Sequence, residues 1–178
     1  MRPLTERNTP TRASRRESDA AETVFRRPEV SDGVEMWRIA RDSRVLDLNS
    51  GYTYALWCRD FAETSIVAAG PDNALVGFVT GYRRPDDPDT LFVWQVAVDA
   101  DRRGRGIATG MLDGLINRVH PVGVRRLETT VSPDNDASIA MFTALAARRG
   151  KRLTRTPLFA PNDFPESHLA EDLYTIGW

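Results

Sequence analysis

A nearly continuous apolar run leads into an arginine- and glycine-rich turn and then into a helical pattern over residues 91–119. The apolar part, Leu91 to Val98, is typical of a strand that is covered on both faces. Beyond the turn, apolar residues recur every four positions and predict a helix: Ile107, Met111, Leu115 and Val119. A buried strand that feeds directly into a helix favours an α/β fold.

The segments around this unit alternate in the same way. Strands are predicted at residues 23–27, 65–69, 74–82, 126–131, 152–156 and 172–176, and helices after residue 31 and at 52–61 and 134–149. The Pro- and Asp-rich stretch 84–90 is predicted to be a loop, and Gly150 to close the last helix. The order β-α-α-β-β-β-α-β-α-β-β predicts an α/β fold with a mixed central β-sheet flanked by helices.

The first helix offers a specific local prediction. Ser31 is a suitable N-cap, with Asp32 in the first turn. The spacing of Val34, Trp37 and Ala40 places them on one helical face.

Composition limits the domain organisation. Residues 1–22 hold many charges and no aromatic residue, so they are predicted to form a disordered tail, and 23–178 a single domain. The formal net charge of −1 favours neither nucleic acid nor a membrane as partner. No segment reads as a membrane span or secretory signal, so a cytoplasmic location is expected. The single cysteine, Cys58, excludes an internal disulfide and a cysteine-based metal cage, and is expected to be buried.

The turn after the apolar strand has the composition of an anion site. Glycines let backbone N–H groups approach a ligand closely, and a helix N-terminus adds partial positive charge, so the turn suits a pyrophosphate. Arg102, Arg103 and Arg105 supply cations. The turn contains neither a dinucleotide fingerprint nor a P-loop. A purely structural strand-to-helix connection is the alternative.

The spacing Arg103-x-x-Gly106-x-Ala108 resembles the pyrophosphate loop of the GNAT acetyltransferases. The resemblance implies the GNAT fold, acetyl-CoA as the cosubstrate and no metal. It also implies cofactor contacts from the end of the strand and from the turn: Gln95, Val96, Ala97, Val98, Arg103, Gly104, Arg105, Gly106, Ala108 and Thr109.

A second GNAT-like feature lies at the start of the helix predicted over 134–149. In the family an Asn opens this helix near the pantetheine arm, and a Tyr seven residues later often protonates the departing thiolate. Asn135 matches, and Ser138 and Phe142 are expected beside it, but Phe142 stands where the Tyr would be. The usual proton donor therefore does not carry over, and Phe142 also fits a plain core position.

Four further segments resemble one branch of the family, the enzymes that acetylate L-2,4-diaminobutyrate in ectoine biosynthesis. They are residues 45–52, 76–82, 91–98 and 127–131. This resemblance, which spans most of residues 24–178, implies acetyl transfer to the γ-amine of that amino acid, under osmotic stress, by a homodimer.

The residue chemistry suggests where such an acceptor would bind. Selective acetylation needs anionic groups that keep the α-ammonium charged, and a base that deprotonates the γ-amine. Substrate contacts are therefore expected from these side chains: Asp47, Asn49, Ser50, Tyr52, Trp94, Glu128, Thr130 and His168.

Several of these residues have a structural interpretation beside the functional one. Glu128, an acid within an apolar strand, is the first candidate base, and Asp47 the second. Glu128 also fits a charge on an edge strand, and Asp47 a turn or helix cap. Trp94 fits a core position, and His168 a surface position, equally well. His120 is interpreted as a helix cap.

Nothing in the sequence resembles an activated nucleophile, so direct transfer without a covalent acetyl-enzyme is predicted. A GNAT enzyme for another amine, such as a peptide N-terminus or an aminoglycoside, is one alternative. A CoA-binding module without catalysis is the other, because Phe142 replaces the Tyr.

Overall fold

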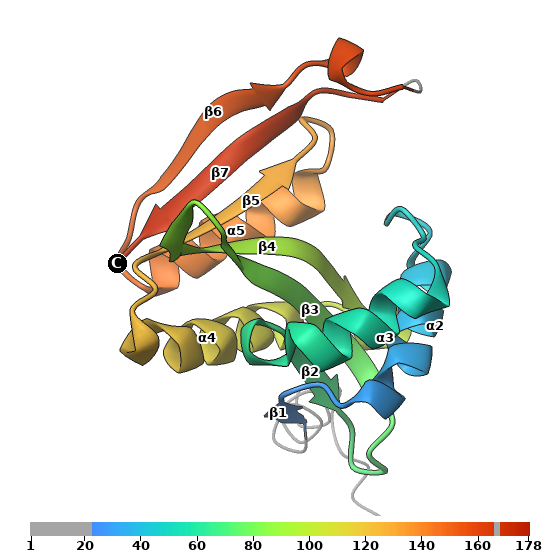
Figure 1. The fold of residues 1–178 in the computed structure, drawn as a ribbon. Coiled ribbons are helices and arrows are strands. Elements are labelled where there is room, and N and C mark those ends of the chain that lie inside the picture. The colour runs from blue at the N-terminus through green and yellow to red at the C-terminus, as the bar shows by residue number, and fades with distance from the viewer. Residues whose placement is uncertain (1–22, 166–167) are drawn as a thin grey trace, which may run out of the picture.

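The computed structural model describes residues 23–165 and 168–178, and a seven-stranded sheet forms its centre (Figure 1). The sheet order is β1-β2-β3-β4-β5-β7-β6, and within it only β4 and β5 run parallel. The strands are β1 (Val24–Arg26), β2 (Ile66–Ala69), β3 (Leu75–Arg84), β4 (Asp87–Val98), β5 (Arg126–Val131), β6 (Leu153–Phe159) and β7 (Glu171–Gly177).

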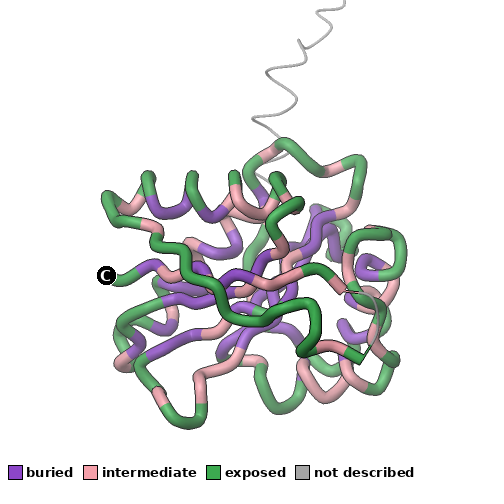
Figure 2. Tube along the Cα trace, turned by 90° about the horizontal axis from the view of Figure 1, so that it is seen from above, coloured by how far each residue is buried: buried purple, intermediate pink, exposed green. Residues whose placement is uncertain are grey.

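Two pairs of helices cover opposite faces of this sheet. The helices α2 (Gly33–Ser43) and α3 (Gly51–Asp60) pack on one face, where Met36 and Tyr54 meet Phe78 of β3. The helices α4 (Ile107–Val119) and α5 (Asp136–Arg148) pack on the other face, against β2 to β5 and β7. Buried segments accordingly run through the middle of the molecule between exposed outer turns (Figure 2).

The observed element order confirms the predicted mixed α/β sheet. Gly150 has a left-handed φ of 62° just beyond α5, as expected of a helix-terminating glycine. Cys58 is buried, with its Sγ 3.4 Å from the Met36 Sδ. The predicted disordered tail, residues 1–22, lies outside the described residues.

The prediction for the start of the first helix is wrong. Ser31 lies inside a short 3-10 helix, Val30–Asp32, and α2 begins at Gly33. The Asp32 carboxylate accepts the Glu29 backbone N–H at 2.7 Å and pairs with Arg26, so Asp32 is the acid that closes this turn. Because α2 begins at Gly33, its buried face contains Met36, Ile39 and Ala40, whereas Val34 is 72% exposed.

Two predictions for β4 are also wrong. Residues 84–90 do not form a loop, because β3 and β4 stay paired as far as Arg84 and Asp87. Nor is β4 covered on both faces, since Trp94 is 37% exposed and Val96 is half-buried. The uncovered residues of β4 face a gap in the sheet.

This gap arises where β4 and β5 separate. They pair only from Thr90 to Phe92, opposite Arg126 to Glu128. Beyond that point β4 continues along β3 and β5 continues along β7, so the sheet splits (Figure 1). None of the helices within 23–165 and 168–178 has the length and apolar character needed to cross a membrane.

Candidate active site

A cavity of about 540 Å³ occupies the split between β4 and β5. The α2–α3 loop (residues 44–50) closes one side, α5 another, and the connection between β6 and β7 a third. Its walls are formed by Val45, Leu46, Asp47, Asn49, Trp94, Gln95, Val96, Thr129, Thr130, Val131, Ser132, Asp134, Asn135, Ser138, Met141, Phe142, Phe159, Phe164, His168, Leu169 and Glu171. We call this the wedge cavity.

The side chain of Gln95 fixes the α2–α3 loop onto β4. Its Nε2 donates to the Asp47 backbone carbonyl at 3.1 Å, and its Oε1 accepts from the Tyr54 hydroxyl at 3.2 Å. Asn49 Nδ2 donates to the same carbonyl at 3.2 Å. These bonds use the main chain of Asp47, an exposed residue of the cavity wall, and its side chain has no cationic partner among the described residues.

Trp94 reaches the cavity through a β-bulge. The register passes from Thr80–Gln95 to Gly81–Val93, so Trp94 has no partner residue on β3. A bulge redirects a side chain in this way. The indole stacks on Trp57 of α3, with ring centroids 4.5 Å apart, and forms a flat cavity wall.

Two backbone N–H groups near the end of β4, those of Val96 and Val98, point into the split between β4 and β5. The Gln95 N–H donates to the Thr80 hydroxyl at 3.1 Å, and the Asp99 N–H to the Val76 carbonyl at 2.9 Å, so both point toward β3. Because direction alternates along an antiparallel strand, the amides of Val96 and Val98 point the other way, where no strand pairs with them. The predicted contribution of the Gln95 amide is thus replaced by a contact within the sheet.

Glu171 is a cavity residue that the sequence reasoning missed. It is the first residue of β7 and is half-buried in the cavity wall. Burial raises the pKa of its carboxyl group, and the negative charges of Asp47 and Asp172 act in the same direction. A hydrogen bond with Thr130 and the charge of His168 oppose this rise. The sequence feature that could have indicated Glu171 is the pair of adjacent acids, Glu171 and Asp172, at the start of the last predicted strand.

His168 stands beside Glu171 in the cavity wall. Its ring stacks on Phe164, with centroids 4.0 Å apart, and its Nδ1 lies 2.7 Å from the Leu169 carbonyl. A carbonyl only accepts hydrogen bonds, so Nδ1 carries a proton and donates it in this contact.

Three of the predicted substrate-binding residues do not line the wedge cavity. The Glu128 carboxylate is buried and accepts a hydrogen bond from Arg84 Nη1 at 3.0 Å. Ser50 is the N-cap of α3, where its Oγ accepts the Thr53 N–H. Tyr52 is 72% exposed on the outside of that helix. The remaining predicted residues, Asp47, Asn49, Trp94, Thr130 and His168, meet in the cavity although they come from four segments.

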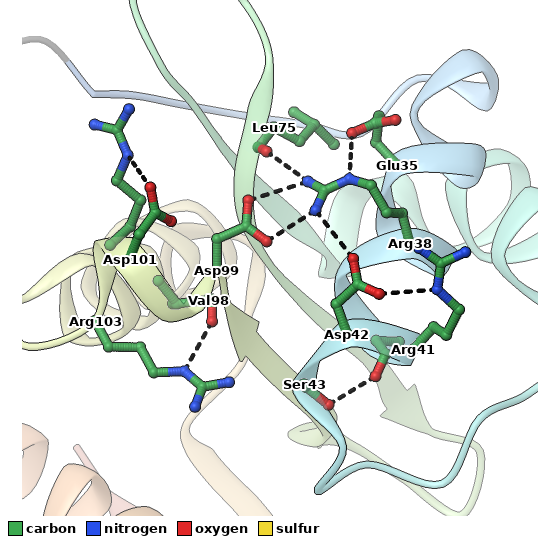
Figure 3. Close-up of polar contacts among 12 residues, drawn as sticks. Glu35, Arg38, Arg41, Asp42, Ser43, Leu75, Val98, Asp99, Asp101 and Arg103 are labelled. Carbon is green, nitrogen blue, oxygen red and sulfur yellow. Dashed lines mark hydrogen bonds and ion pairs between the residues drawn. The ribbon is translucent and has the colours of Figure 1, made fainter.

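The β4–α4 loop (residues 99–106) has the backbone shape of an anion site. Gly104 and Gly106 have φ values of 72° and 78°, which favour glycine, and α4 begins directly after them. The first amides of α4, including those of Ala108 and Thr109, lack acceptors within the helix. Arg103 donates from Nε to the Val98 carbonyl at 3.1 Å (Figure 3).

Helix α5 opens on the cavity. Asn135 is its N-cap, with Oδ1 accepting the Ser138 N–H at 3.1 Å. Phe142, only 2% exposed, belongs to the core and also forms part of the cavity wall. No cluster of three His, Cys, Asp or Glu side chains that could hold a metal occurs within the described ranges.

The arrangement suits transfer between two molecules. Outward-facing amides at the end of β4 and at the start of α4 can bind a ligand by its carbonyl and its phosphates, and Asp47 and Glu171 can bind cationic groups in the cavity. Burial raises the pKa of the Cys58 thiol to about 11, so a cysteine nucleophile does not fit.

Comparison with known proteins agrees with this geometry. Residues 33–146 match the model of the acetyltransferase (GNAT) family. The chain is 58% identical to the L-2,4-diaminobutyric acid acetyltransferase of Nocardia farcinica, over 86% of this chain and 79% of the relative. It is 57% identical to that of Streptomyces coelicolor, over 88% and 94%.

Solved structures give the same picture. Diaminobutyrate acetyltransferase EctA from Paenibacillus lautus, in complex with its substrate L-2,4-diaminobutyric acid and coenzyme A, superposes with a TM-score of 0.83 at 44% identity, over 88% of this chain and 95% of that one. Ard1 from Thermoplasma volcanium, at 20% identity and a TM-score of 0.71, covers 88% of this chain and 99% of its own and shares the fold.

Proposed function

This chain belongs to the GNAT acetyltransferase family and, within it, to the L-2,4-diaminobutyric acid acetyltransferases, and we propose that it transfers the acetyl group of acetyl-CoA to the γ-amine of L-2,4-diaminobutyrate. The product is N4-acetyl-L-2,4-diaminobutyrate. The structure of the Paenibacillus lautus relative holds both diaminobutyric acid and coenzyme A, which supports the choice of both substrates.

The presence of two carboxylates in one small cavity is the observation that carries the proposal. Asp47, in the α2–α3 loop, and Glu171, at the start of β7, are far apart in the sequence and both line the wedge cavity. Diaminobutyrate carries two ammonium groups, so a site with two anions complements it. A peptide N-terminus presents one such group and gives the second carboxylate no partner.

We assign the base to Glu171 rather than to Glu128. Glu171 lines the cavity, and burial raises its pKa toward the range of an efficient general base. Glu128 is outside the cavity and already bound to Arg84. Thr130 lines the same cavity, and its hydroxyl acts to lower the pKa of Glu171.

Selectivity for the γ-amine follows from the different roles of the two acids. Asp47 keeps the α-ammonium protonated and therefore without a free electron pair. The γ-ammonium gives a proton to Glu171, and its nitrogen then attacks the thioester carbonyl carbon. The ring of His168 and the flat face of Trp94, both in the cavity wall, help to orient the substrate.

The end of β4 stabilises the reaction intermediate. The attack places negative charge on the thioester oxygen, which the amide of Val96 or Val98 can bind from the split in the sheet. Collapse of the intermediate breaks the C–S bond and releases the CoA thiolate. The attacking nitrogen must lose a second proton to become a neutral amide. Because Phe142 has no proton to donate, this second proton, passed through solvent, neutralises the thiolate.

The nucleotide end of acetyl-CoA is assigned to the β4–α4 loop. Gly104 and Gly106 let the loop amides face a pyrophosphate, and the start of α4 adds partial positive charge. Asn135 and Ser138 at the start of α5 lie where the pantetheine arm would pass between the loop and the cavity.

We also assign the chain to ectoine biosynthesis, in the cytoplasm of cells under osmotic stress, and to a homodimer. The names of its relatives give diaminobutyric acid as the molecule that is acetylated, and this substrate supports the pathway. Acetyl-CoA as the cosubstrate supports the location. The outer strand β6 supports the dimer, because Leu158 is 44% exposed on a strand that pairs only with β7 among the described residues. Light scattering should give twice the chain mass, and Leu158→Lys should shift it to one chain.

The deciding experiment measures CoA release with a panel of amines. Diaminobutyrate, ornithine, lysine, a short peptide and an aminoglycoside are compared as acceptors, and NMR identifies the acetylated nitrogen. We expect turnover confined to diaminobutyrate, with the acetyl group on the γ-nitrogen. Turnover only with another amine overturns the substrate, and CoA binding without turnover favours a binding module.

A further inference from the structure

Three carboxylates surround the guanidinium of Arg38, on helix α2 (Figure 3). Glu35 Oε2 accepts from Nε at 2.8 Å, and Asp42 lies 3.7 Å from Nη1. The third, Asp99, is distant in sequence and accepts from both Nη1 and Nη2 at 3.0 Å. Such a two-pronged contact fixes both the distance and the orientation of its partners.

Asp99 stands where β4 ends and the β4–α4 loop begins. Its backbone N–H donates to the Val76 carbonyl of β3, and its carbonyl accepts the Arg102 N–H of the following turn, both at 2.9 Å. Arg38 Nη2 also donates to the Leu75 carbonyl at 3.3 Å. Through Arg38, helix α2 is thus bonded both to β3 and to Asp99, the first residue of the β4–α4 loop.

We propose that Arg38 is a positioning residue for acetyl-CoA, acting through Asp99 on the β4–α4 loop. This inference rests on the proposed assignment of that loop to the pyrophosphate. Arg38 is not among the residues of the wedge cavity, and its guanidinium is turned toward Asp99 rather than toward the acceptor.

Two physical effects make this contact matter for binding. The loop contains two glycines, which have much conformational freedom to lose when a ligand orders them, and the anchored Asp99 reduces that loss. Moreover, an unpaired carboxylate at the start of a pyrophosphate loop would repel the ligand, and Arg38 neutralises it.

The same helix leads into the acceptor side of the site. Ser43, its last residue, donates from Oγ to the Ala40 carbonyl, and Arg44 then turns the chain with a φ of 56° into the α2–α3 loop that carries Asp47. Arg38 therefore joins the element that ends at the acceptor to the loop that begins the donor site.

The test compares acetyl-CoA with acetyl-pantetheine, which lacks the pyrophosphate and the nucleotide. For the full-length Arg38→Gln variant, we expect Kd for CoA by calorimetry and KM for acetyl-CoA to rise about tenfold, equivalent to about 1.4 kcal/mol. KM for acetyl-pantetheine and kcat should stay within about twofold, because the thioester end does not touch the loop. An equal rise for both donors, or no rise, would overturn the proposal.

Two further variants make the result independent of one substitution. Asp99→Asn breaks the two-pronged contact but leaves no unpaired carboxylate, so it should raise Kd for CoA selectively by less than Arg38→Gln does. It decides the question if Arg38→Gln does not fold. Arg38→Lys keeps the positive charge but not the two-pronged contact with Asp99, so its affinity for CoA should lie between those of Arg38→Gln and the wild type. The matched control is Arg41→Gln, since Arg41 lies on the same helix and pairs only with Asp42 among the described acids.

The outcomes separate this inference from the proposed function. Wild-type protein that binds no CoA contradicts the proposed function itself. Wild-type protein that binds CoA, with variants that match it, contradicts only the role of Arg38.

Discussion

The β4–α4 loop and the wedge cavity are built from the chain in different ways. The loop consists of consecutive residues, and its chemistry lies in main-chain amides that Gly104 and Gly106 expose. The cavity gathers side chains from the α2–α3 loop, β4, β5, α5 and β7. The difference teaches that a backbone site tolerates side-chain changes, whereas a site of convergent side chains depends on each of them.

The largest expected effect tests the cavity. Glu171→Gln keeps the shape of the side chain but removes the base, so kcat/KM for diaminobutyrate should fall by roughly 10²–10⁴-fold. Steady-state kinetics at saturating acetyl-CoA measures it. The matched control is Glu128→Gln, which should keep kcat within about twofold while lowering stability by about 1–2 kcal/mol. A greater loss from Glu128→Gln would return the base to Glu128.

The pH dependence sharpens the same assignment. Because burial raises the pKa of Glu171, its carboxylate form exists only above that raised pKa, and kcat/KM should fall about tenfold per pH unit below it. Between the ordinary and the raised pKa the native state binds more protons than the unfolded state. The free energy of unfolding should therefore decrease as pH rises through this window.

Glu171→Gln provides the comparison for both pH measurements. Kinetic profiles and chemical denaturation at several pH values should show a flatter stability curve for this variant than for the wild type. An acid limb of kcat/KM at the pKa of an ordinary glutamate would count against a buried base.

A smaller effect is expected at the other carboxylate of the cavity. Asp47→Asn removes the charge that we assign to the α-ammonium, and KM for diaminobutyrate should rise about tenfold, as expected for a lost charged hydrogen bond. Acetyl-CoA kinetics should not change. Asp42→Asn, on the exposed side of α2, is the control. A rise in KM for acetyl-CoA instead would place Asp47 on the donor side.

The smallest effect is expected in the β4–α4 loop. An added Cβ at Gly106 meets no atom within 4 Å, so Gly106→Ala carries only the conformational cost of a left-handed φ, about 1–2 kcal/mol. KM for acetyl-CoA should rise about fivefold to tenfold, with KM for diaminobutyrate unchanged. Gly51→Ala, equally uncrowded but without a positive φ, should change neither constant.

Features that depend on neighbouring residues could be read from the sequence. The element order and the strand-turn-helix unit around Gly104 and Gly106 follow from local chemistry. The role of Asn135 at the start of α5 was implied by the family resemblance, since the residue pattern began that helix at residue 134. The start of α2 was misplaced because Asp32 and Ser31 are both good caps, and only the contacts of Asp32 with Arg26 and Glu29 decide between them.

Features that depend on the path of the whole chain could not be read in this way. Glu128 and Glu171 are both acids in strands, and nothing local distinguishes a residue bound to Arg84 from one that faces the cavity. The pairing of Arg38 with Asp99 likewise joins residues 61 positions apart.

The sequence by itself determined the order of the elements and the strand-turn-helix unit around Gly104 and Gly106, because hydrophobic periodicity and glycine placement act over a few residues. The family followed from the resemblance of that unit to the GNAT acetyltransferases. The tertiary structure alone decided which carboxylates share the wedge cavity. The physical reason is the early separation of β4 from β5, which opens the cavity and sets which side chains from distant segments line it.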